Sequence, residues 1–193
     1  MLPRATLVLC LLAGTAVAQE RPSLVPTRDV DITYHLLGPH PGTLHMSTQA
    51  NTGLTRVDNP NQHGYAIIDR RNHHMTMVMT ERQTYIEAPT AGAEQHSPDL
   101  DPTARFTRQG TDTVAGLRCT VWEYANDHMS GSACVTDDGV LLRSRDSTGQ
   151  HGLEAAEVSY VSRPDADFHP PPGFTQQQMP TMGGMPPGHP PPR

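Results

Sequence analysis

GTDTVAGLRCTVWEY (residues 110–124) and GSACVTDDGVLLRSR (131–145) are the two stretches with the strongest strand pattern in this chain. Each contains one cysteine, Cys119 or Cys134, within a run of β-branched and alternating residues. A bond between the two would join neighbouring strands and, for a loop of this length, would stabilise the fold by about 3 kcal/mol. A zinc site would need two further ligands at close spacing, and a redox pair usually has the spacing C-x-x-C. We therefore predict a structural disulfide.

The N-terminus has the pattern of an export signal. MLPR is followed by the apolar run ATLVLCLLA (5–13) and by small residues that end at Ala18. This pattern predicts that residues 1–18 are a signal peptide, cut between Ala18 and Gln19. We therefore expect a periplasmic or secreted protein.

The apolar run is too short for a membrane anchor. Gly14 and Thr15 interrupt it before it reaches the roughly 20 residues of a membrane-spanning helix, so we expect a protein that is not membrane-embedded. Removal of the signal also removes Cys10. An even number of cysteines then remains in an oxidising compartment, which favours the disulfide.

Composition limits the classes of function. About 175 residues remain after cleavage, enough for one domain with a sizeable core. The formal net charge of the chain is −6, and loss of Arg4 makes it one unit more negative, which argues against nucleic acid as a partner. No G-x-S-x-G, P-loop or EF-hand pattern is present, so we expect no enzymatic activity and no cofactor.

Short alternating runs separated by turn residues continue along most of the chain. The clearest turn signal is Asp137-Asp138-Gly139, which predicts a hairpin between the strands on either side. The spacing is that of an antiparallel meander. The predicted strands are Asp29–Leu37, Thr43–Gln49, Leu54–Asp58, Gly64–Asp69, Met75–Thr80, Gln83–Glu87, Ala104–Gln109, Arg118–Tyr124, Gly131–Thr136, Val140–Asp146 and Glu154–Ser162.

Helices are few or short in this prediction. Only Pro89–Ala104 has the composition for a turn or two of helix, and its prolines exclude a longer one, so we expect a loop there. From His169 onward Pro, Gly, Gln and Met dominate and apolar periodicity disappears. We predict a signal peptide at 1–18, a leader at 19–27, a β-rich domain at 28–174 and a disordered tail at 175–193.

Several runs resemble a known family. FTRQGTDTVAGLRCTVWEY, ACVTDDGVLLR and FHPPPGF are similar to segments of exported proteins of the DUF4412 type, as are GLTRVDNP and YAIIDRRNHHMTMVMTERQTYIE nearer the N-terminus. The resemblance covers roughly residues 28–174. Such proteins are placed near the periplasmic lipoprotein carriers and lipid-binding lipoproteins of the LolA and LppX kind.

The resemblance implies a mainly β fold built on a strongly curved antiparallel sheet, a half-barrel. Its concave face would be covered by helices or loops and would hold an acyl chain. The resemblance supplies no catalytic residues for positions of this sequence.

The run HHMTMVM (73–79) contains the first candidate site. Met75, Met77 and Met79 alternate, so in a strand they point to one face. Methionines suit an adaptable apolar surface in a core or in a pocket for a flexible ligand such as an acyl chain. Three thioethers with His73 or His74 could instead bind copper(I), so copper remains the alternative.

Trp122 is the second candidate. In a strand Cys119, Val121 and Glu123 share one face, whereas Trp122 lies on the other. Trp122 either packs into the core or forms a platform for a ligand.

Together these patterns predict a non-catalytic exported binding module for a hydrophobic or lipid-like ligand in the cell envelope. Its partner would be a hydrophobic small molecule or an acyl chain, contacted by Met75, Met77, Met79 and Trp122. The alternative function is periplasmic copper handling through the methionines and histidines of 73–79.

Overall fold

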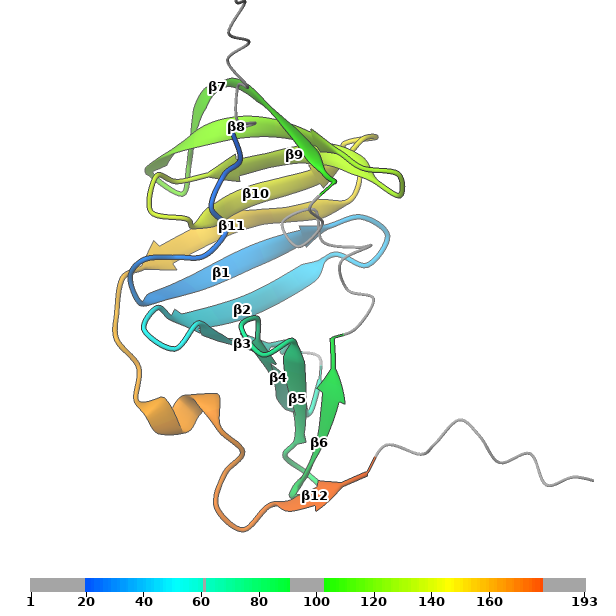
Figure 1. The fold of residues 1–193 in the computed structure, drawn as a ribbon. Coiled ribbons are helices and arrows are strands. Elements are labelled where there is room, and N and C mark those ends of the chain that lie inside the picture. The colour runs from blue at the N-terminus through cyan, green and yellow to red at the C-terminus, as the bar shows by residue number, and fades with distance from the viewer. Residues whose placement is uncertain (1–19, 61, 91–102, 179–193) are drawn as a thin grey trace, which may run out of the picture.

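The computed structural model describes residues 20–60, 62–90 and 103–178. Twelve strands in these residues form one open, strongly curved sheet (Figure 1). The described residues contain no α-helix, and their one short helix is a 3-10 turn, η2 (Asp165–Phe168). The predicted fold class, a curved antiparallel half-barrel with few or short helices, is confirmed. The predicted signal peptide at 1–18 lies outside the described residues.

The sheet consists of two meanders in which each strand pairs with the next one along the chain. The strands of the first meander are β1 (Val30–Leu37), β2 (Gly42–Gln49), β3 (Leu54–Asp58), β4 (Gly64–Asp69), β5 (His74–Met79) and β6 (Thr84–Pro89). The strands of the second are β7 (Arg105–Val114), β8 (Leu117–Ala125), β9 (Ser130–Val135), β10 (Leu141–Asp146) and β11 (Gly152–Ser159).

The first strand joins the two meanders. β1 pairs with β2 on one side and with β11 on the other, antiparallel in both cases. β1 therefore lies in the middle of the sheet, and β7 forms one edge. At the other edge a three-residue strand, β12 (Thr175–Gln177), pairs in parallel with β6.

Each of the eleven predicted strands corresponds to one of β1 to β11. β7 extends beyond its predicted end at Gln109 to Val114, because a bulge between Arg108 and Gly110 lets the strand continue through the glycine. Thr175–Gln177, which the prediction placed in a disordered tail, lie in the sheet as β12. Residues from 179 onward lie outside the described part of the chain, as do residues 91–102 of the predicted loop.

The predicted disulfide joins β8 and β9. Cys134 is paired in register with Val121, and its sulfur is bonded to that of Cys119, with 5.4 Å between the two Cα atoms. Both cysteines are buried in a core cluster with Val30, Tyr34 and other residues of the central strands. Trp122 points to the other face, as predicted, and belongs to a second cluster.

The two faces of the sheet differ in what covers them. Ile32 and Tyr34 of β1 point to the concave face, which we call the inner face, whereas Asp31 and Thr33 point to the outer face. The chain before β1 crosses the inner face, and Leu24 packs there against the second cluster. The chain after β11 crosses the outer face on its way to β12 (Figure 1).

Asp138, in the turn between β9 and β10, holds both crossing segments. Its backbone oxygen accepts a hydrogen bond from the Thr27 N–H at 2.9 Å, and its carboxylate pairs with Arg28 at 2.7 Å. The hydroxyls of Thr136 and Tyr160 donate to the same carboxylate. Partial burial alone would raise the pKa of Asp138, but these hydrogen bonds outweigh it and hold the pKa below its ordinary value.

Candidate functional site

A cavity of about 330 Å³ lies on the inner face. Phe106 of β7 and Thr55 of β3 both line it, although six strands lie between β7 and β3 in the sheet. This is possible only because the sheet curls around the cavity. Its volume falls near the lower end of the roughly 300–1,000 Å³ of known ligand cavities.

The segment before β1 forms one wall of the cavity. Leu24, Val25 and Pro26 line it, and Arg21 lies over the ring of Phe106 at 5.1 Å from the centroid. Gly139 allows this close approach, because a Cβ atom there would lie 2.3 Å from the Val25 carbonyl oxygen. The N-terminal segment is thus fitted against the β9–β10 turn at the side of the cavity.

Most side chains in the cavity wall are apolar, and the polar ones described here are largely satisfied within the protein. The Tyr34 hydroxyl donates to the Leu141 carbonyl oxygen at 2.6 Å, and the hydroxyls of Thr48 and Thr55 are 3.1 Å apart. Burial raises the pKa of Tyr34 far above its ordinary value, and the positive charge of Arg70 opposes this effect in part. Tyr34 therefore stays neutral, and the guanidinium of Arg70 lies close enough to act on it.

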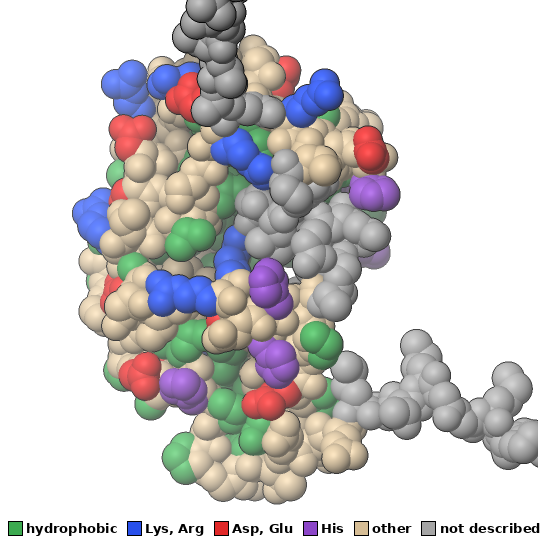
Figure 2. Space-filling view, in the orientation of Figure 1, with side chains coloured by type: hydrophobic (Ala, Val, Ile, Leu, Met, Phe, Trp, Pro, Cys, Tyr) green, Lys and Arg blue, Asp and Glu red, His purple; other side chains and the backbone are tan. Residues whose placement is uncertain are grey.

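An apolar row leads from the cavity across the first meander. Residues directly opposite each other on antiparallel strands share a face, and here they form one continuous series. Its members are Ile32, Met46, Val57, Ala66, Met77 and Ile86, one from each strand from β1 to β6. Hydrophobic side chains gather toward the middle of this face in the lower half of Figure 2.

The predicted site residues share the inner face with the cavity but do not line it. Met75, Met77 and Met79 belong to β5, where Met77 is 48% exposed and precedes Ile86, the last residue of the apolar row. Trp122 is 6% exposed and is packed among Phe106, Tyr124 and Ala133. A direct ligand contact for these four residues stays a prediction.

The residues of the copper alternative are divided between two faces. His74 precedes Met75 in β5 and therefore points to the opposite face from the three methionines, and His73 lies in the β4–β5 turn with a φ of 52°. Among the described residues, no three His, Cys, Asp or Glu side chains are grouped so that they could hold a metal ion. Copper binding stays a prediction.

Two features of the cavity could not be identified from sequence patterns. The wall contributed by Leu24–Pro26 comes from the predicted leader, which has no strand periodicity. Arg70 follows the last residue of β4 in a polar turn, where an arginine is ordinary. Tyr34 and Met46, by contrast, lie in strands that the alternation of apolar and polar residues identifies in the sequence.

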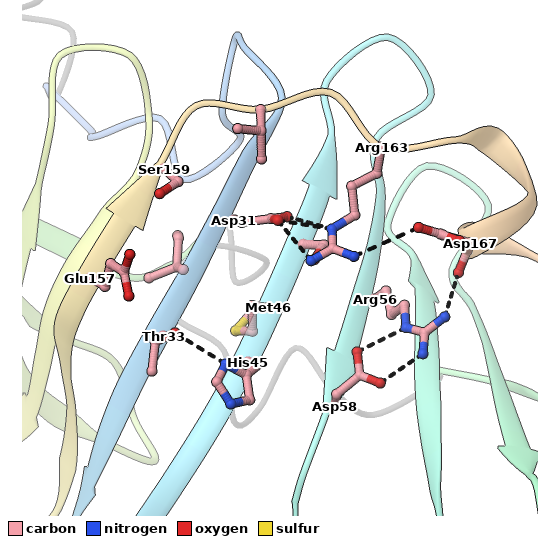
Figure 3. Close-up of a pocket in the computed structure, with 13 residues that line it drawn as sticks. Asp31, Thr33, His45, Met46, Arg56, Asp58, Glu157, Ser159, Arg163 and Asp167 are labelled. Carbon is pink, nitrogen blue, oxygen red and sulfur yellow. Dashed lines mark hydrogen bonds and ion pairs between the residues drawn. The ribbon is translucent and has the colours of Figure 1, made fainter.

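A second, polar cleft of about 650 Å³ lies on the outer face (Figure 3). Its arginines tie the C-terminal segment to the sheet: Arg163 pairs with Asp31 at 2.8 Å and lies 3.7 Å from Asp167. Arg56 pairs with Asp58 at 2.8 Å and donates to the backbone oxygen of Asp167 at 3.1 Å. The charged groups labelled beside η2 in Figure 3 are therefore paired with one another or with the backbone. We assign the cleft a structural role, because these pairs hold the C-terminal segment on the sheet.

The described residues contain no helix with the length and apolar character needed to cross a membrane.

Solved structures with the same fold include proteins of different kinds. An uncharacterized conserved protein from Thermus thermophilus is 10% identical, with a TM-score of 0.58 over 79% of this chain and 91% of that chain. PNGF-II is 14% identical, with a TM-score of 0.52 over 79% of this chain and 32% of its own. A chain of the Pseudomonas aeruginosa MucA/MucB complex is 12% identical, with a TM-score of 0.51 over 76% of this chain and 56% of its own.

At these identities the likeness shows the fold alone, and this chain spans only about a third of PNGF-II and about half of the MucA/MucB chain. None of the curated proteins matches the chain in sequence. The family model described as "Domain of unknown function (DUF4412)" matches residues 40–150, more than half of the chain. The resemblance seen in the sequence is thereby confirmed, and the chain belongs to the DUF4412 family.

Proposed function

We propose that this protein is a non-catalytic exported binding module that holds a hydrophobic, lipid-like ligand on the inner face of its sheet. The observation that carries the proposal is the apolar cavity, which continues into the row from Ile32 to Ile86. An apolar surface that the protein leaves half-exposed is stabilised when a ligand removes it from water. An elongated ligand could lie in the cavity and along this row.

The first test is whether the protein carries a ligand from its own compartment. Native mass spectrometry of the mature chain purified from the periplasm should show a bound species whose mass is that of a lipid. The delipidated protein should then bind a fluorescent fatty-acid probe. Protein that copurifies with no lipid and binds no acyl probe would overturn the proposal.

Substitutions locate the binding surface. Met46→Asp should abolish probe binding, since Met46 lines the cavity and an unpaired carboxylate on an apolar surface has a large desolvation cost. The matched control is Val161→Asp, because Val161 is 46% exposed and lies on the outer-face cleft. Circular dichroism and melting curves check that both variants fold.

Substitutions of Met77 test how far the ligand extends along the row and distinguish lipid binding from copper binding. Met77→Asp should weaken binding of a long-chain probe more than that of a short one, because Met77 lies near the outer end of the row. Met77→Leu keeps the apolar volume and removes the sulfur. It should leave probe binding unchanged, whereas loss of copper(I) binding in this variant would support the alternative function.

A further inference from the structure

The inner cavity has one charged side chain among its described lining residues, and it is Arg70. This arginine is half-buried and lies in the turn directly after β4. The other polar side chains in the described lining are hydroxyls, among them those of Tyr34, Thr48 and Ser144. A cation in an otherwise apolar wall is unfavourable unless an anion or several hydrogen-bond acceptors lie beside it.

Arg70 marks the boundary between the cavity and a second hollow. This hollow of about 380 Å³ shares Leu24, Val25, Gly53 and Arg70 with the cavity, and Arg71 lines it as well. Arg70 therefore lies where the two spaces meet, beside the N-terminal segment. This position is at the end of the strands, whereas the apolar row runs across them.

Positive side chains line this boundary. Arg70 and Arg71 line the second hollow, and no Asp or Glu is among the described residues that line either space. The carboxylate of Asp69, the residue before Arg70, acts on Arg71 from outside the lining. Arg70 is therefore the cation of the cavity lining itself, and a positive charge there attracts anions.

Both arginines are held in place by the protein. Arg71 donates to the Asn51 carbonyl oxygen at 2.9 Å and lies against Gly53, where a Cβ atom would be 2.9 Å from the Arg71 Nε. Arg70 also makes contacts within the protein. A bound anion would join or exchange with those contacts at a guanidinium that is already positioned.

The geometry points to an amphiphile with an anionic head group as the ligand of the inner face, with its head on Arg70 and its apolar chain in the cavity. A guanidinium can donate two parallel hydrogen bonds to a carboxylate or a phosphate, which makes arginine suited to such head groups. This inference rests on the proposed function and adds the chemical class of the ligand.

The test compares charged and uncharged forms of one acyl chain. Delipidated mature protein is titrated with a fluorescent fatty acid and with its methyl ester. The wild-type protein should bind the acid more tightly, with an affinity that falls as salt rises. Arg70→Gln should lose about tenfold to a hundredfold in affinity for the acid, as expected when a hydrogen-bonded charge pair is removed. It should bind the ester as the wild type does.

Matched variants separate the head-group contact from a structural effect. Arg70→Lys keeps the charge but not the paired donors, and its affinity for the acid should lie between those of the wild type and Arg70→Gln. Arg82→Gln removes an exposed arginine from the next turn of the meander and should change neither affinity. An equal loss for acid and ester in Arg70→Gln would assign Arg70 a structural role and overturn the inference.

Two further probes identify the source of the anion. Lysophosphatidic acid offers a phosphate, and lysophosphatidylcholine offers a zwitterion on a similar chain. Tighter binding of either the fatty acid or lysophosphatidic acid, compared with the zwitterion, supports an anionic head-group site. Equal affinities of the wild type for all the probes would overturn the inference while leaving the proposed function intact. Failure to bind any probe would overturn both.

Discussion

The two meanders of the sheet have similar lengths but different interiors. The second, β7 to β11, contributes most of the buried core, including Trp122, Leu142 and both cysteines of the disulfide. In the first meander, β1 adds Val30, Ile32 and Tyr34 to the same core cluster as the cysteines. In β2 to β6 the buried apolar side chains are Ile67, Val78 and Ala88. These five strands instead present half-exposed apolar residues on their inner face. One meander thus provides most of the stability, and the other provides most of the apolar surface open to a ligand.

The largest effect should follow from a change in the core of the second meander. Leu142→Ala should lower the free energy of unfolding by about 2–5 kcal/mol, because Leu142 is fully buried and its truncation leaves a cavity. Met77→Ala, in the first meander, should change it by less than about 0.5 kcal/mol. Urea denaturation measures both. Equal losses would remove the contrast between the meanders.

Loss of the disulfide should have the next largest effect. Cys119→Ala combined with Cys134→Ala should destabilise the protein by about 3 kcal/mol, because the unfolded chain regains the conformational entropy that the disulfide removes. A reductant should bring the wild type to a similar stability and should leave the double variant unchanged. Free thiols in the unreduced, denatured wild type would contradict the assignment.

Asp138 should give a smaller, pH-dependent effect, because it fastens both crossing segments to the second meander. Asp138→Asn should cost about 1 kcal/mol at neutral pH, the typical net value of a hydrogen bond. The folded-state pKa of Asp138 is lower than the unfolded value, so its ionised form stabilises the fold above roughly pH 4 and this contribution is lost as the pH falls.

The stability difference between the wild type and Asp138→Asn should therefore narrow below about pH 4 in urea titrations at a series of pH values. Asp127→Asn, an exposed carboxyl in the β8–β9 turn, is the control and should follow the wild type throughout. A difference that widens in acid would show that the ionised carboxylate is not what stabilises the turn.

A small effect should come from the edge of the first meander. Truncation after Phe174 removes β12, whose three residues are exposed and held by pairing with β6 on one side. The melting temperature should fall by no more than a few degrees, or less than about 1 kcal/mol. A much larger fall would mean that the C-terminal residues contribute to the core.

The sequence predicts the strands and the disulfide because both depend on local patterns. Alternation identified β1 to β11, and the Asp-Asp-Gly turn placed Cys134 beside the following strand. β12 was missed since Thr175–Gln177 lie in a proline- and glutamine-rich stretch, and the path of the preceding segment sets their parallel pairing. The family resemblance led us to expect a ligand on the concave face, but the residues that line the cavity were missed, because they come together only when curvature brings β3 and β7 to the same space.

The pairing of β1 with β11, the seam between the two meanders, also has a consequence for the order of folding. Each meander can form from hairpins between neighbouring strands. The seam instead pairs Asp31 with Ser159 and Leu37 with Gly152, so its formation closes a loop that contains most of the chain. Contacts so distant in sequence slow folding, which predicts that joining the meanders is the rate-limiting step. Until then β1 exposes an unpaired edge that carries Val30, Ile32 and Tyr34, the kind of edge that pairs with other chains. Substitutions in this seam should therefore change aggregation during refolding more than they change the stability of the finished fold.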